Sequence, residues 1–352
     1  MINAHRMLRC LSIAVAMMLL PVNVEGQDTI TLQKAAGRGT RVSGRITDTS
    51  PTEITVESSG SKRTVSVNEI VRIALDGEPS GLKQARAALA AGQYEQALEA
   101  LDKVQLPKSA ADLLQQELDF ARGQAAAQLA LKGSGDVAEA SKLLVDFVRK
   151  NRNTFHFYEC AELLGQLAVA SGNYENATRY FQHLSNAPWS DFKLRSDVLV
   201  GNSLRAQGKF DDAIRQFDSA LDAKAKEPAE LRQVTFAQLG KAACLAEQGQ
   251  YDKAIESIES VIANNDPDDA ELFAQAYLAL GSAQRTAKRP IDAVLAYLHI
   301  DLLFYSQRDA HAEALFYLSQ LWPQLEEPAR GVEARQLLIA RYAGSVWAQR
   351  AK

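Results

Sequence analysis

The sequence predicts a mainly α-helical protein, a solenoid of about seven helical hairpins preceded by a small all-β barrel. Three observations support this prediction. The 352 residues are 47% hydrophobic, 23% charged and only 7% aromatic, a composition that suits a folded and largely helical chain. Apolar residues recur with a period of two before residue 79 and with a helical period after it. One short pattern of glycine, an aromatic residue and alanine repeats along the helical part.

Residues 1–26 have the order of a secretory signal. Arg6 and Arg9 precede an apolar run over residues 10–20, and a proline follows it. The run is much shorter than the ~20 apolar residues that a membrane-spanning helix needs. We therefore expect cleavage after Gly26, export to the periplasm or outside the cell, and no stable membrane insertion of the mature chain.

Net charge limits the kinds of partner to expect, and the cysteines indicate whether a disulfide forms. Without Arg6, Arg9 and Glu25 the 39 basic and 43 acidic residues become 37 and 42, a formal net charge of −5. A mildly acidic chain is a poor general binder of nucleic acids, so we expect no nucleic-acid partner. Cys160 and Cys244 lie in apolar helical stretches two repeats apart, and we expect buried small residues rather than a disulfide.

Residues 27–78 carry the signals of about five short strands. Alternating apolar residues stand between glycine, aspartate, serine and proline punctuation. A closed barrel would hide the strand edges of so small a sheet. The run from Gly39 to Ile46 resembles the second strand of Sm-like small barrels, in which a glycine lets the strand bend. Cytosolic Sm-like barrels bind RNA, but export and acidic charge favour a structural or interaction module here.

The helical part, residues 79–352, repeats one turn pattern: glycine, any residue, an aromatic, any two residues, alanine, any three residues and a large apolar residue. Four copies are complete, and degenerate copies follow the same frame at Gly135 and Pro290. The complete copies are Gly92-Gln-Tyr94 with Ala97 and Leu101, Gly172-Asn-Tyr174 with Ala177 and Phe181, Gly208-Lys-Phe210 with Ala213 and Phe217, and Gly249-Gln-Tyr251 with Ala254 and Ile258.

This pattern resembles the tetratricopeptide (TPR) repeat family, whose unit is a helical hairpin. Leu164-Gly165, Val200-Gly201 and Tyr277 with Leu280-Gly281 fit positions of the family's first helix. The resemblance implies that glycine ends the first helix, the aromatic residue fills the groove between helices, and alanine lets them approach. The recurring alanines, Ala97, Ala140, Ala177, Ala213, Ala254, Ala293 and Ala334, are spaced by 36 to 43 residues, so helices or loops exceed the standard repeat of 34.

The end of the sequence has a motif of its own. Arg341-Tyr-Ala-Gly-Ser345 precedes a final short helix, and it looks like the end motif of bacterial envelope repeat proteins.

No catalytic, metal or cofactor motif emerges, so we expect a protein that is not an enzyme. The histidines of the mature chain, His156, His183, His299 and His311, lack partners at zinc-site spacing. They are expected to be surface or satisfied core residues. The acidic cluster from Asp266 to Glu271 lacks the spacing of a calcium loop and is expected to cap a helix instead.

The TPR resemblance implies that the first helix of each hairpin lines a concave surface on which partner segments lie. Counting back from each turn glycine places a mixed set of side chains there, including Glu159, Glu162, Val198, Leu239 and Leu278. Asn202, Arg205 and Arg285 resemble the residues with which some family members hold a peptide carboxylate, because arginine can donate two hydrogen bonds to it. The candidate partner-binding residues are Arg195, Asn202, Arg205, Phe236, Gln275 and Arg285.

The sequence therefore predicts a non-catalytic scaffold that binds protein or peptide partners on this concave face. An alternative is an accessory subunit of a cell-envelope machine, in which the β module recognises a lipid, glycan or protein ligand.

Overall fold

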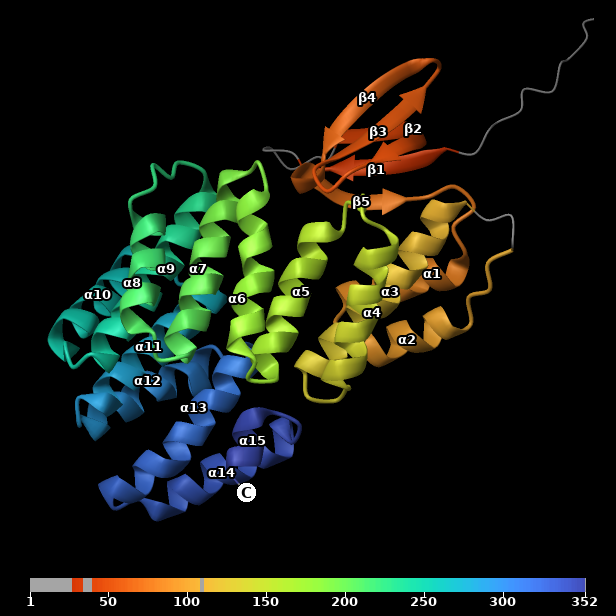
Figure 1. Ribbon diagram of the computed structural model, residues 1–352. Helices are drawn as coiled ribbons and strands as arrows, with labels where there is room; N and C mark the ends of the chain where they lie inside the picture. Colours follow the sequence, from red (N-terminus) through yellow and green to blue (C-terminus); the bar gives the residue numbers. More distant parts are fainter. Residues whose placement is uncertain (1–26, 34–39, 108–110, 352) are drawn as a thin grey trace, which may run out of the picture.

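The computed structural model describes residues 27–33, 40–107 and 111–351. A small antiparallel sheet comes first in the chain, and a curved array of helices follows it (Figure 1). The proposed signal, residues 1–26, lies outside the described residues. Within the described part, no helix is both long and apolar enough to cross a membrane.

The sheet has five strands in the order β4-β3-β2-β1-β5. All its strand pairs are antiparallel. The two outer strands in this order, β4 and β5, are consecutive in the chain and are joined by a short 3-10 turn over Val67–Glu69. The strands alternate as expected, with Ile30 and Ile54 fully buried. Closure of this sheet into a barrel remains a prediction. The strands are β1 Asp28–Leu32, β2 Thr40–Thr49, β3 Glu53–Ser58, β4 Ser61–Ser66 and β5 Ile70–Ala74.

Seven consecutive helical hairpins and one further short helix follow in the described residues. We call the first helix of each hairpin its A helix and the second its B helix. The hairpins are α1 Ser80–Ala90 with α2 Tyr94–Asp102, α3 Asp112–Leu131 with α4 Val137–Lys150, α5 Phe157–Ala170 with α6 Tyr174–Gln182, α7 Ser190–Ala206 with α8 Phe210–Leu221, α9 Pro228–Glu247 with α10 Tyr251–Asn264, α11 Ala270–Thr286 with α12 Pro290–Leu303, and α13 Arg308–Leu321 with α14 Pro328–Tyr342. The short helix α15 spans Val346–Arg350.

The turn glycines of the four complete copies have the left-handed backbone that ends a helix. Their φ angles are 70° to 81°, at Gly92, Gly172, Gly208 and Gly249. The degenerate copies differ in this respect. In the second hairpin Gly133, not Gly135, has the positive φ, and in the sixth Lys288 takes the same conformation at φ 60°. The turn can therefore form without glycine, at some strain in the backbone.

Close packing within each hairpin explains the repeated small residues. All seven recurring alanines lie on B helices and are buried. On the A helices, a Cβ atom added to Gly201 would lie 2.6 Å from the Phe217 ring, and one added to Gly281 would lie 2.6 Å from the Tyr297 ring. These glycines are required because a large ring of a B helix occupies the space of a side chain.

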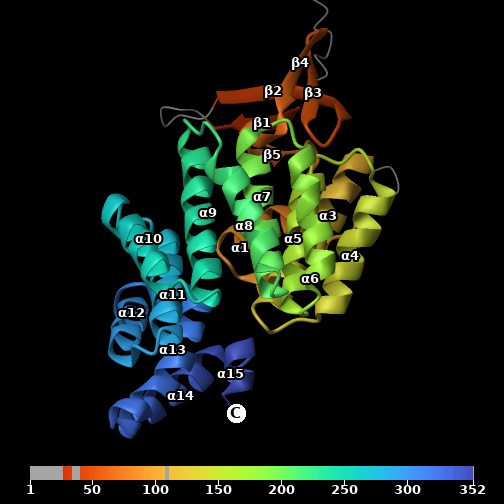
Figure 2. The ribbon, with the colours of Figure 1, turned by 60° about the vertical axis from the view of Figure 1, so that its left-hand side comes forward.

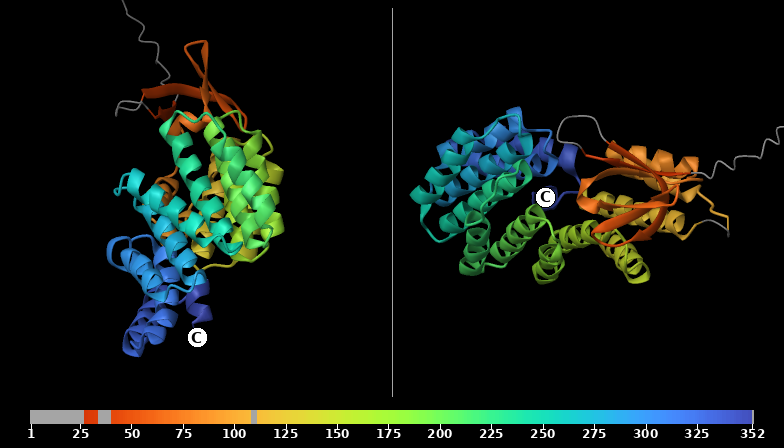
Figure 3. Two further views of the ribbon diagram at one scale, coloured as in Figure 1. Left: turned by 90° about the vertical axis from the view of Figure 1, so that its left-hand side faces the viewer. Right: turned by 90° about the horizontal axis from the view of Figure 1, so that it is seen from above.

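The array is curved, as Figure 3 shows. Its A helices lie on the inner side, since Glu271 of α11 acts electrostatically on Glu162 of α5, three hairpins away. A helices of successive hairpins contact one another along α1, α3 and α5 and along α7, α9, α11 and α13. The sheet lies across one end of the helices, above α5 and α7 (Figure 2). Its core includes Leu114 of α3 and Phe155, and the Trp189 indole donates a hydrogen bond of 3.0 Å to the Ser66 hydroxyl. The sheet is therefore fixed to the helices rather than tethered beside them.

Candidate partner-binding interior

All six candidate residues lie on A helices, as the sequence predicts. Arg195, Asn202 and Arg205 belong to α7, Phe236 to α9, and Gln275 and Arg285 to α11. Arg195 and Gln275 are exposed, and the other four are partly buried. Three apolar residues expected on the same surface, Val198, Leu239 and Leu278, instead lie in the core, because their faces of the A helices pack against neighbouring helices.

Two of the candidate arginines converge on one carboxylate. Arg205 of α7 and Arg285 of α11 both act electrostatically on Glu313 of α13, although these helices belong to three different hairpins. Burial raises the pKa of Glu313 to about 7, and the positive charges of the arginines limit this increase. We call Arg205, Arg285 and Glu313 the arginine cluster. It lies on the inner side of the array.

The arginine cluster has spare hydrogen-bonding capacity. The Nε atoms of Arg205 and Arg285 are buried and have no hydrogen-bond partner among the described residues. The Arg285 guanidinium lies 4.7 Å from the centroid of the Tyr317 ring, which stacks on Tyr297 at 5.3 Å. Buried donors without acceptors are unfavourable, and a guanidinium group is suited to donate to carboxylate and carbonyl oxygens.

Nearer the sheet, ion pairs join neighbouring A helices. Arg195 pairs with Glu162 of α5 at 2.5 Å, and Arg232 of α9 pairs with Asp269 at 3.0 Å and with Glu271 at 2.8 Å. Burial raises the pKa of Glu162, and the charge of Glu271 adds to this effect across the interior. Asp269 also caps α11 by accepting a hydrogen bond from an amide of its first turn, as the sequence predicts. Arg195 is thus already engaged, unlike the Nε atoms of the arginine cluster.

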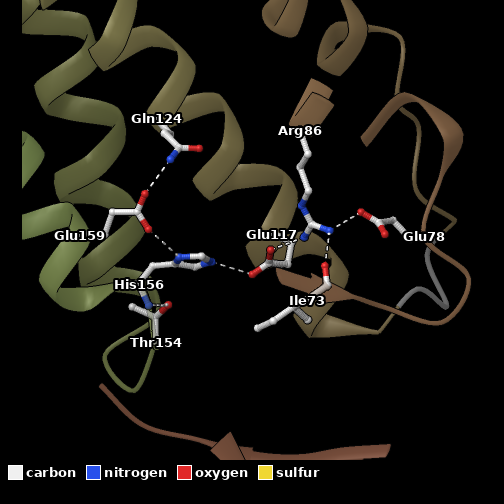
Figure 4. A network of polar contacts seen from close by, with 8 residues as sticks. All are labelled: Ile73, Glu78, Arg86, Glu117, Gln124, Thr154, His156 and Glu159. Carbon is white, nitrogen blue, oxygen red and sulfur yellow. Dashed lines mark hydrogen bonds and ion pairs between the residues drawn. The ribbon is translucent and has the colours of Figure 1, made fainter. Parts of the chain in front are cut away.

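A second polar cluster lies where the sheet meets the first three hairpins (Figure 4). The Arg86 guanidinium on α1 pairs with Glu78 and with Glu117 of α3, and it donates a hydrogen bond of 3.0 Å to the carbonyl oxygen of Ile73 in β5. His156, just before α5, pairs with Glu117 at 2.7 Å. We call Arg86, Glu117 and His156 the junction network, because it joins the sheet to three A helices.

Glu117 of the junction network is buried, and Arg86 and His156 are partly buried. Burial alone would lower the pKa of His156, but the charge and hydrogen bond of Glu117 raise it to about 9. Burial would likewise raise the pKa of Glu117, but His156 and Arg86 lower it. His156 also stacks on Phe120 at a centroid distance of 3.6 Å. The sequence does not reveal this network, since its members are separated by loops and carry no recognisable spacing.

The pKa of His156 predicts a loss of stability at alkaline pH. The folded-state pKa of about 9 exceeds the ordinary value of 6.5, so the stabilising contribution is complete below pH 6.5 and disappears as the pH rises through 9. We expect the free energy of unfolding, measured by urea denaturation, to fall between pH 6.5 and 9.5. In the His156→Gln variant this fall should be smaller, and an identical pH profile in both proteins would contradict the expectation.

Comparison with known proteins identifies the type of array. Residues 80–106 and the overlapping segments 200–270 and 239–300 match models described as tetratricopeptide repeat. The array is a TPR-like solenoid. No curated protein matches the chain in sequence.

Two solved structures share this TPR-like fold. One is the Rap protein complexed with Competence and Sporulation Factor, which is 16% identical, with 77% of each chain covered and a TM-score of 0.54. The other is a tetratricopeptide repeat protein from Parabacteroides merdae, which is 14% identical, with 77% of this chain and 97% of that chain covered and a TM-score of 0.53. At these identities the likeness concerns the fold.

Two cysteines lie in the core of the array. Cys160 and Cys244 are free and buried, and burial raises the pKa of both thiols, that of Cys244 to about 11. They are poor nucleophiles at neutral pH because the thiolate is the reactive form. The described residues contain no group of three or more acidic, histidine or cysteine residues placed to hold a metal ion. What the interior does offer is arginine donors, tyrosine rings and a carboxylate.

Proposed function

We propose that this protein is a non-catalytic scaffold of the periplasm or extracellular space, and that its helical interior binds a segment of a partner protein. The arginine cluster carries the proposal. Arg205 of α7 and Arg285 of α11 each have a buried Nε atom without an acceptor, and guanidinium groups match the carboxylate and carbonyl groups of a peptide. The Rap structure is itself a complex, with Competence and Sporulation Factor, which supports a binding role for an array of this fold.

In this proposal the sheet caps the array rather than acting as a separate recognition module. The Trp189 hydrogen bond to Ser66 and the Arg86 hydrogen bond to Ile73 fix it to hairpins one and four. Its core is continuous with Leu114 of α3. Because these contacts reach hairpins one, two and four, the sheet covers the ends of their helices and braces this half of the array.

Charge reversal in the arginine cluster tests the proposal. The double variant Arg205→Glu, Arg285→Glu is expected to capture partners from a cell-envelope extract at less than about a tenth of the wild-type yield, because like charges would face the peptide groups. The measurement is affinity capture by the full-length protein, followed by quantitative mass spectrometry.

Two further proteins control this experiment. The matched control Arg179→Glu, Arg215→Glu makes the same charge change at exposed positions of the outer helices α6 and α8 and should retain the partners. The variant Arg205→Gln, Arg285→Gln removes the charge without adding repulsion and should still lose most of the yield. If both interior variants retain every wild-type partner, the interior is not the binding surface.

A further inference from the structure

The short helix α15 closes the curve of the array. Just before it, Gly344 lies against Gly133 in the turn between α3 and α4, so closely that a Cβ atom on either glycine would overlap the backbone of the other. The seventh hairpin thereby meets the second, although some two hundred residues separate them in sequence. In the right-hand view of Figure 3 the chain end beside α15 is seen inside the outline of the curve.

The contacts of α15 use the same surface as the arginine cluster. Trp347 packs on Phe316 and Tyr317 of α13, with ring centroids 5.3 and 5.6 Å apart. One turn later, the charge of Arg350 acts on Glu313 and on Tyr317. Ala348 is fully buried in the same core. The Trp347 ring of α15 therefore packs on α13, and the exposed Arg350 lies near enough to influence Glu313.

The helix α15 is too short to be stable on its own. It has five residues, fewer than an isolated helix needs to be stable in water, so its helical form depends on docking. The Ser345 hydroxyl caps it by accepting a hydrogen bond of 3.1 Å from the Ala348 amide, and Val346 remains half exposed. Segments of this kind open far more readily than the core on which they lie.

We propose that α15 occupies, within the chain, a docking site for a short partner helix that presents an aromatic residue and, three residues later, an arginine. Such a helix would place its ring on Phe316 and Tyr317 and its guanidinium near Glu313. Its binding would displace α15 and separate Gly344 from Gly133, which opens the interior. This inference rests on the proposed function, and it adds the chemistry of the partner and the self-occupation of the site.

The test adds the sequence of α15 as a separate peptide. A fluorescein-labelled peptide of residues 341–351 is titrated into full-length wild-type protein and into the full-length Trp347→Ala variant, and fluorescence anisotropy gives each affinity. The peptide should bind the variant at least about tenfold more tightly, because the wild-type site is filled by its own α15 and is rarely vacant. Equal affinity for both proteins, or no binding to the variant, would overturn the proposal.

Controls separate docking from unfolding. A peptide with alanine in place of Trp347 should not bind, and the Trp322→Ala protein, which lacks a tryptophan outside α15, should behave as wild type. If Trp347→Ala proves unfolded by circular dichroism, the Arg350→Glu protein replaces it with the same expectation.

Equal peptide affinity for both proteins, combined with partner capture that depends on Arg205 and Arg285, would refute this inference alone. If peptide docking is seen but no variant of the arginine cluster affects capture, the proposed function fails instead.

Discussion

Replacing Glu117 with alanine is expected to lower the free energy of unfolding by about 3–5 kcal/mol, the loss typical of removing one partner from a buried ion pair. Glu117 is 4% exposed, and its carboxylate accepts hydrogen bonds from both Arg86 and His156. Without it, two cations remain in the junction between the sheet and the helices with one carboxylate fewer to balance them. Urea denaturation at pH 6.5, where His156 is charged in the folded protein, measures the effect.

Asp119→Ala is the matched control for this variant. Asp119 lies on the same helix, α3, and pairs at 3.3 Å with Lys150, whose side chain is largely exposed. An exposed pair contributes at most about 1 kcal/mol. A loss at Glu117 no larger than the loss at Asp119 would show that the junction network does not hold the sheet on the array.

The second large effect is expected where Phe217 is held between two glycines. Its ring lies against Gly201 of α7 on one side and Gly240 of α9 on the other, and an added Cβ atom at either glycine would overlap it. Phe217 is fully buried, so the ring has little free space into which to shift. Gly201→Ala and Gly240→Ala should each destabilise the protein by about 1–2 kcal/mol, since overpacking outweighs the gain in helix propensity of up to ~1 kcal/mol.

A double-mutant cycle shows whether the ring causes this loss. Phe217→Leu removes the atoms that the new methyl group would meet, so the double variant Gly240→Ala, Phe217→Leu should be more stable than the sum of the single effects predicts. Thermal unfolding followed by circular dichroism gives the free energies. Strict additivity would mean that the glycine is needed for some other reason than the ring.

The hairpins were predictable because their signals are local. The positive φ of Gly172, the buried Ala177 and the ring of Phe181 all belong to one turn of sequence, and each stands where the repeated pattern places it. The same pattern misplaced the turn at Gly135, because Gly133 also satisfies the left-handed position and the longer loop cannot be read from spacing. Lys288 shows the converse, because the left-handed turn conformation forms there although the residue is not glycine.

The site was predictable only in part, for a physical reason. Counting back from the turn glycines placed Arg205 and Arg285 on the inner side. Glu313 was not predicted, because its hairpin has Glu326 rather than a glycine at the left-handed turn position and so gives no residue to count from. The pairing of His156 with Glu117 depends on how neighbouring hairpins pack, and the contact of Gly344 with Gly133 depends on the curvature of the whole array. Curvature accumulates from small rotations between repeats, and no local pattern encodes it.

Crosslinking from the inner surface tests the central claim most directly. A photoactivatable amino acid is placed at Gln275, which is exposed on the A helix α11, and in a second protein at Glu256, which is exposed on the B helix α10. Each full-length protein is irradiated in the living cell, and crosslinked products are identified by mass spectrometry. The account predicts a discrete partner crosslinked from position 275 and absent from position 256. The same products from both positions, or products from position 256 alone, would contradict it.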